Sequence, residues 1–197
     1  TFQKGGNNNE DGMIIKYSAG GEVEWAKSIG KNSYQGGITL VTETRDGGYI
    51  AGGYFSGSID LGNGVTLNGS SDGMLIKYSS TGEAEWTRVI GGNDEEYIKS
   101  VATTSDGGYI IGGVFNESIE VENYTLTNSG GSDGMVIRLK NKELRNLVVT
   151  SEKTIGGSGI DTIQSVVITS DGGYLIGGYF RGGNIDLGNG VILTNIN

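Results

Sequence analysis

The sequence predicts an all-β protein built from three copies of one unit of about 60 residues. The tripeptide Asp-Gly-Met occurs at residues 11–13, 72–74 and 133–135, so two equal spacings of 61 residues separate its copies. Short β-branched and aromatic runs recur in every copy, and no segment shows helical apolar spacing over even two turns. A repeat of this length indicates units that bury their apolar faces against one another.

Two further landmarks follow Asp-Gly-Met in the same order in each copy. The first is Asp-Gly-Gly-Tyr, and it begins at Asp46, Asp106 and Asp171. The second is an isoleucine followed by an acidic and an apolar residue, and it begins at Ile59, Ile119 and Ile185. These landmarks predict a single repeat domain over residues 1–197, with copies at about 11–71, 72–132 and 133–197.

Each copy begins with two predicted strands, here called third and outer after their expected places in a four-stranded sheet. The third strands are the β-type runs Met13–Tyr17 and Met74–Tyr78. The outer strand at 22–29 alternates apolar and polar residues, which indicates one wet side. The Gly-Glu-x-Glu-Trp element of this strand is missing from residues 140–154, so the third copy carries no such signal for an outer strand.

The inner and second strands complete the predicted sheet. The inner strands are β-branched runs, and they lie at 38–44, 98–104 and 163–169. An Asp-Gly-Gly reversal then leads to the second strands, and these lie at 49–55, 109–115 and 174–180. Each second strand contains a Gly-Gly pair, at 52–53, 112–113 and 177–178. A phosphate loop needs glycines at a strand-to-helix junction, so these pairs predict bulges or close sheet contacts instead.

An extra arm of roughly 15 residues lies between the second and third strands, for example at 57–71. Its core, residues 60–65, contains Asn63-Gly64, the strongest short signal for a hairpin turn. We therefore expect a small hairpin in each arm.

The succession Asp-Gly-Met-x-Ile-Lys-Tyr, Gly-Glu-x-Glu-Trp, Ile-Gly-Gly and Val-x-x-Thr-x-Asp-Gly-Gly-Tyr-x-x-Gly-Gly resembles the bacterial β-propeller repeat called SBBP. The resemblance covers nearly the whole chain and implies four-stranded β-propeller blades in a secreted or cell-surface bacterial protein. Propellers typically have roughly four to eight blades, so three copies predict an incomplete ring. Either the chain is a piece of a longer one, which we favour, or copies complete the ring by oligomerisation. The alternative is a β-trefoil, which also has three four-stranded repeats and closes alone.

Composition excludes several classes of chemistry. The chain has no Cys and no His, which removes disulfides, thiolate metal sites, Ser-His-Asp hydrolysis and zinc chemistry. The net charge of -9 makes nucleic acid a poor partner. No apolar run approaches the about 18 residues that span a bilayer, so we expect no membrane insertion. Acidic residues recur once per copy, and no nucleophile–base pair emerges, so we expect no enzyme.

Candidate binding residues form two groups. The first pairs an acid with an asparagine three residues later in each arm: Asp60 and Asn63, Glu120 and Asn123, Asp186 and Asn189. Such oxygens could hold Ca²⁺, but the spacing matches no complete calcium loop and a hairpin turn already explains Asn-Gly. No cofactor is predicted, and the sequence does not decide whether a metal ion binds. The second group is Trp25 and Trp86, which could stack on a sugar but are better explained by packing between sheets. The acidic run at 94–96, with a counterpart in Asp161, is predicted to be a solvated turn.

The function predicted from these features is a non-enzymatic binding or scaffolding module of a secreted or cell-surface bacterial protein. Its partner would be a protein or a glycan. One alternative is a lectin-like propeller with a carbohydrate site in each copy. A second alternative is the non-catalytic part of a larger propeller enzyme.

Overall fold

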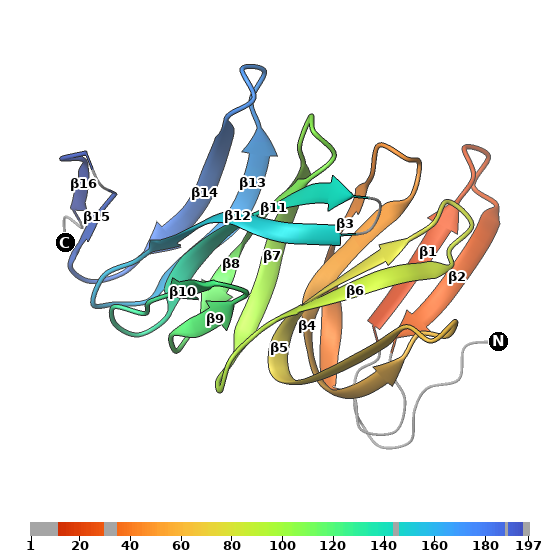
Figure 1. The fold of residues 1–197 in the computed structure, drawn as a ribbon, viewed down its shortest axis with the longest axis horizontal. Coiled ribbons are helices and arrows are strands. Elements are labelled where there is room, and N and C mark those ends of the chain that lie inside the picture. The colour runs from red at the N-terminus through yellow and green to blue at the C-terminus, as the bar shows by residue number, and fades with distance from the viewer. Residues whose placement is uncertain (1–11, 30–34, 144–145, 188, 195–197) are drawn as a thin grey trace.

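The computed structural model describes residues 12–29, 35–143, 146–187 and 189–194 (Figure 1). All regular structure in these ranges is β-strand, which confirms the predicted all-β class. The strands form small antiparallel sheets that follow one another along the longest axis of the molecule. The first strands, β1 and β2, lie at one end of this row, and the last strands, β13 to β16, lie at the other end.

Two of the sheets are complete four-stranded antiparallel meanders. The first has the order β3-β4-β5-β6, and its strands are β3 (Gln35–Glu43), β4 (Tyr49–Asp60), β5 (Thr66–Tyr78) and β6 (Ala84–Ile90). The second has the order β7-β8-β11-β12, and its strands are β7 (Glu96–Thr103), β8 (Tyr109–Phe115), β11 (Asp133–Glu143) and β12 (Asn146–Ile155). Both sheets thus run inner, second, third, outer. Each takes its first two strands from one copy of the sequence pattern and its last two from the next copy.

A two-stranded sheet lies at each end of the row. The N-terminal half-sheet pairs β1 (Gly12–Tyr17) with β2 (Val23–Ile29), which match the third and outer strands of the complete sheets. The C-terminal half-sheet pairs β13 (Asp161–Ile168) with β14 (Tyr174–Phe180), which match the inner and second strands. The two half-sheets therefore contain complementary halves of the same four-stranded pattern.

The arms form hairpins, as predicted. In the first complete sheet, β4 and β5 continue through the arm and turn at residues 61–65, where Asn63 and Gly64 have positive φ angles of 53° and 75°. The other two arms are separate two-stranded hairpins, made by β9 (Ile119–Val121) with β10 (Tyr124–Leu126) and by β15 (Asn184–Asp186) with β16 (Ile192–Thr194).

The structure decides two points that the sequence left open. The third copy does have an outer strand, because β12 pairs with β11 over its whole length despite the missing Gly-Glu-x-Glu-Trp element. Backbone pairing to a neighbouring strand does not depend on that element. The trefoil alternative needs a closed sheet, and none of the sheets formed by the described residues closes on itself.

The core lies between successive sheets, because each strand places alternate side chains on opposite faces. Between the two complete sheets, Ile50 and Leu75 pack against Ile98, Val101 and Ile111. Similar apolar layers join β1–β2 to the first complete sheet and join the second complete sheet to β13–β14. Each internal sheet is thus buried on both faces.

The second glycine of each Gly-Gly pair lies opposite a β-bulge of the inner strand. A Cβ at Gly53, Gly113 or Gly178 would come within 1.9, 2.3 or 2.0 Å of a carbonyl oxygen on that strand. At Gly112, the first glycine of its pair, a Cβ would lie 2.7 Å from side chains of Ile163 and Val166 on the following sheet. The predicted structural role of the pairs, as bulges and close sheet contacts, therefore agrees with the geometry.

Candidate functional site

The first predicted acid–asparagine pair is engaged in the hairpin turn that joins β4 and β5. Asp60 Oδ1 accepts a hydrogen bond of 2.9 Å from the backbone N–H of Gly62. The Asn63 side chain points out of the turn and donates through Nδ2 to Glu83 Oε2 at 3.0 Å. Asp60 therefore stabilises the turn, as aspartate side chains commonly do.

The other two pairs lie in separate hairpins. Glu120 Oε1 accepts a hydrogen bond of 2.7 Å from the Thr125 hydroxyl across the β9–β10 hairpin, and Asn123 lies in the turn of that hairpin. Asp186 ends β15, and Asn189 has a φ of 53° in the following turn. Within the described ranges, no three acidic side chains are grouped so that they could hold a metal ion.

Both tryptophans pack against the sheet that follows them in the row. Trp25 on β2 meets Tyr49 edge-on at 5.7 Å between ring centroids, and its Nε1 donates to the carbonyl of Ser80 at 3.1 Å. Trp86 on β6 meets Tyr109 in the same way at 6.1 Å. The equivalent position on β12 is Ser151, and the equivalent tyrosine, Tyr174, is 43% exposed.

Replacing Trp86 by alanine is expected to lower the free energy of unfolding by about 2 kcal/mol, because it removes half-buried apolar area and an aromatic pair. Urea denaturation followed by circular dichroism measures this loss. The matched control is Tyr174→Ala, which lacks a tryptophan partner and should cost about 0.5 kcal/mol or less. Equal losses in the two variants would contradict packing as the role of the tryptophan.

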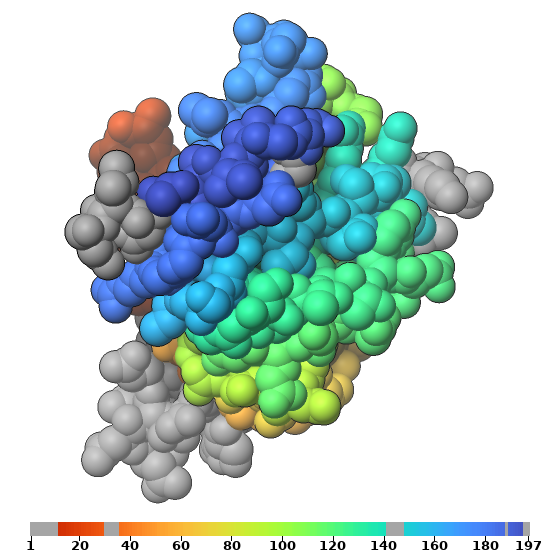
Figure 2. All heavy atoms as spheres, turned by 90° about the vertical axis from the view of Figure 1, so that its left-hand side faces the viewer, coloured from red at the N-terminus to blue at the C-terminus, as the bar shows by residue number. Residues whose placement is uncertain are grey.

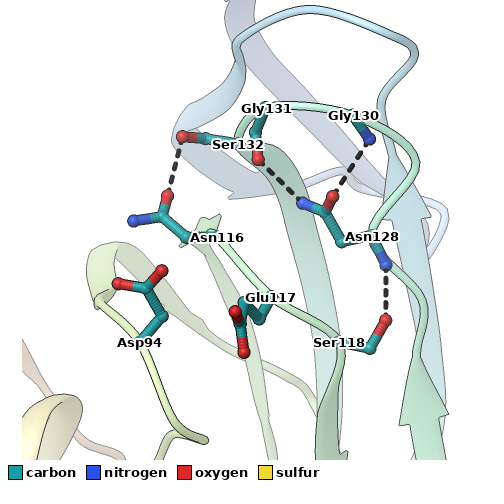
Figure 3. A pocket seen from close by; sticks show the side chains of 8 residues that line it. All are labelled: Asp94, Asn116, Glu117, Ser118, Asn128, Gly130, Gly131 and Ser132. Atoms are coloured by element: carbon teal, nitrogen blue, oxygen red, sulfur yellow. Dashed lines mark hydrogen bonds between the residues drawn. The ribbon is translucent and has the colours of Figure 1, made fainter.

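A polar hollow with a volume of about 700 Å³ lies beside the second complete sheet (Figure 3). Three loops form it: the β6–β7 loop, the β8–β9 loop and the β10–β11 loop. Its lining is formed by polar residues and glycines: Asp94, Asn116, Glu117, Ser118, Asn128, Gly130, Gly131 and Ser132. In Figure 3, Asp94 and Asn116 lie on one side, Asn128 lies on the other, and Glu117 lies between them.

Hydrogen bonds hold the walls of the hollow in place. The Asn128 side chain accepts from the Gly130 N–H at 3.0 Å and donates to the Gly131 carbonyl at 3.1 Å. The Ser132 hydroxyl donates to Asn116 Oδ1 at 2.7 Å and so joins the β8–β9 loop to the β10–β11 loop. The hollow is therefore preformed, which lowers the entropy cost of binding a ligand.

A buried carboxyl group, that of Glu96 at the start of β7, lies near the hollow. Its side chain is fully buried, and Oε2 accepts a hydrogen bond of 3.0 Å from the Gly92 N–H, whereas Oε1 has no partner. Burial is the main cause that raises the pKa of Glu96 to about 7, and the negative charges of Asp72, Asp94 and Glu117 contribute to the same shift. The prediction of a solvated turn at 94–96 is therefore wrong for Glu96.

Two further carboxyl groups, those of Asp133 and Asp161, are buried where the second complete sheet meets β13–β14. Asp133 Oδ2 accepts from the Ser129 N–H at 2.6 Å, and Asp161 Oδ2 accepts from the Gly157 N–H at 2.8 Å. Burial and the charge of Asp161 raise the pKa of Asp133, whose Oδ1 has no partner. Sequence reasoning missed both groups, because it placed Asp161 in a solvated turn and treated Asp133 as a landmark of the repeat. An acidic residue recurs at the start of several strands, and this recurrence was the signal in the sequence that could have revealed the buried groups.

Comparison of the chain with models of known protein families finds no match. Over 107 residues, the chain is 27% identical to the regulatory protein FlaEY of Caulobacter vibrioides. The match covers 52% of this chain and 11% of that protein. No helix long and apolar enough to cross a membrane occurs in the described part of the chain. The chain is thus similar, over about half its length, to a small part of a bacterial regulatory protein.

Proposed function

We propose that the chain is a non-enzymatic binding module composed of SBBP-type β-propeller blades, and that it belongs to a secreted or cell-surface bacterial protein. The repeated strand order of the two complete sheets and the resemblance of the sequence pattern support the blade assignment. Stacked sheets of this kind form a rigid scaffold, and loops on a rigid scaffold are well placed to bind ligands.

The observation that carries this proposal is the preformed polar hollow of Figure 3. It offers the carboxylates of Asp94 and Glu117 together with asparagine and serine side chains on three loops. Carboxylates accept hydrogen bonds, and hydroxyl and amide groups both donate and accept them. This combination suits a ligand rich in hydroxyl groups, so we assign a glycan to the hollow. Trp25 and Trp86 are not part of this site, because they pack between sheets.

A bacterial glycan array followed by calorimetric titration of the best glycan tests this assignment. Saturable binding is expected, and the double variant Asp94→Asn/Glu117→Gln should weaken it about tenfold or more, because it removes two charged acceptors. Glu22→Gln changes an exposed acid that is far in the sequence from the residues of the hollow, so this control should leave the affinity unchanged. Absence of binding to every glycan, or full affinity in the double variant, would contradict the assignment.

A further inference from the structure

Each half-sheet at an end of the row has an edge strand that lacks the hydrogen-bonded neighbouring strand present in the complete sheets. In the complete sheets a second strand pairs with a third strand, as β4 pairs with β5 and β8 with β11. Among the described residues, β14 is a second strand without a third strand beside it, and β1 is a third strand without a second strand. Figure 1 shows β1 and β14 in sheets at opposite ends of the row, so they do not pair within one copy.

Apolar side chains on the outer face of the N-terminal half-sheet are exposed. Met13 is 66% exposed and Tyr17 is 51% exposed, whereas their counterparts on β5, Met74 and Tyr78, are 0% and 2% exposed. The β5 residues are covered by the sheet that precedes them in the row. The half-sheet thus presents the apolar face that an internal sheet buries.

A valine of the inner strand β3 shows the same contrast. Val41 is 55% exposed, but the equivalent Val101 and Val166 are 8% and 5% exposed. Val101 and Val166 are each preceded by a complete sheet, whereas Val41 is preceded only by the half-sheet β1–β2. Val41 is therefore exposed at the place where the inner and second strands of a complete preceding sheet would cover it.

The C-terminal half-sheet supplies strands of that kind, and its outer face is also uncovered. Leu175 on β14 is 64% exposed, whereas the equivalent Ile50 and Ile110 are fully buried. A Cβ at Gly177 would meet no atom within 4 Å, although one at the equivalent Gly112 would collide with the next sheet. Figure 2 looks onto this end of the molecule and shows the C-terminal strands at its surface.

The charges at the two ends are complementary. In the first complete sheet, Lys77 on the third strand pairs at 3.1 Å with Asp46 in the turn between the inner and second strands. Arg138 pairs in the same way with Asp106 at 3.4 Å. The equivalent residues are Lys16 on β1 and Asp171 before β14, and Asp171 has no cation beside it among the described residues.

We propose that β14 of one copy pairs antiparallel with β1 of a second copy, so that two half-sheets become one four-stranded sheet, β13-β14-β1-β2. The register of the internal sheets places Leu175 opposite Lys16 and Gly178 opposite Met13. This sheet covers Met13, Tyr17, Val41 and Leu175 and brings Lys16 to Asp171. The contact is head-to-tail, so it builds a ring if the rotation closes and a filament if it does not.

Analytical ultracentrifugation of the 197-residue chain over a range of concentrations tests the association. Oligomers that grow with concentration are expected, and Leu175→Lys should weaken them about tenfold or more, because it places a charge in the apolar contact. The matched control is Val89→Lys on β6, since Val89 is 37% exposed and lies in an internal sheet. A monomer at all concentrations, or oligomers that Leu175→Lys leaves unchanged, would overturn the proposal.

Thiol crosslinking tests the register and is simplified by the absence of native cysteine. A mixture of two folded single variants, Leu175→Cys and Lys16→Cys, should give crosslinked dimers with a short bis-thiol reagent. The control mixture replaces Lys16→Cys with Ile15→Cys, whose side chain points to the opposite face of β1. Circular dichroism checks that each variant is folded. Equal crosslinking in the two mixtures would exclude the proposed pairing.

Discussion

Replacing Gly113 by alanine is expected to lower the free energy of unfolding by about 3 kcal/mol. The added Cβ would lie 2.3 Å from the carbonyl oxygen of Tyr97 and 2.7 Å from the methyl carbon of Met135. The Tyr97 carbonyl belongs to the bulged strand β7, where residue 99 is the extra residue between the paired Ile98 and Ser100. Because the backbone oxygen cannot move without breaking this pairing, the clash has to shift a whole strand.

Gly177→Ala is the matched control for this prediction, because it changes the same residue type on an equivalent strand. A Cβ at Gly177 meets no atom within 4 Å, so the change should cost about 0.5 kcal/mol or less. Both variants are compared by urea denaturation at low protein concentration, where head-to-tail contacts are absent. Similar stability of the two variants would contradict the assigned close approach of the strands at Gly113.

The stability of the protein is expected to fall by about 3 kcal/mol between pH 4.5 and pH 7 because of Glu96. The unfolded chain releases the Glu96 proton near pH 4.5, whereas the folded protein holds it up to about pH 7. Unfolding therefore releases a proton within this window, and stability decreases as the pH rises through it. Above pH 7 both states are ionised at this residue and its contribution becomes constant.

Glu96→Gln separates this effect from the titration of other groups. The variant should be more stable than the parent chain at pH 8 and should lose most of the decrease between pH 4.5 and pH 7. Thermal unfolding at a series of pH values measures both quantities. The buried Asp133, whose pKa is also raised, should retain its own share of the pH dependence. An unchanged pH profile in Glu96→Gln would mean that Glu96 is already ionised in the folded protein between pH 4.5 and pH 7. That result would contradict the prediction.

Most strands could be predicted from the sequence, because their signals are local. The alternation at 22–29, the β-branched run at 98–104 and the Asp-Gly-Gly turns each depend on neighbouring residues alone, and strands form at each of these places. The order inner, second, third, outer was also expected, and the two complete sheets have it. The outer strand β12 was left open by the sequence, because nothing in its side-chain pattern resembles the tryptophan-containing strands.

The candidate site could not be predicted in the same way, because it depends on where three separate loops meet. Asp94, Asn116 and Asn128 lie on different loops, and no spacing in the sequence brings them together. The burial of Glu96 likewise follows from the stacking of one sheet on another, so an acid that appears suited to a solvated turn has a raised pKa. Conversely, Asp60 in the first arm has the local turn role that its sequence context favours.

Successive sheets stack in the same way along the chain. Nuclear Overhauser spectroscopy tests this stacking directly, because the chain has only two tryptophans and their indole resonances are easily assigned. Contacts from Trp25 to the Tyr49 ring and from Trp86 to the Tyr109 ring are expected, since both pairs have edge-on geometry at similar distances. Absence of the Trp25–Tyr49 contact or of the Trp86–Tyr109 contact would contradict equivalent stacking of the sheets.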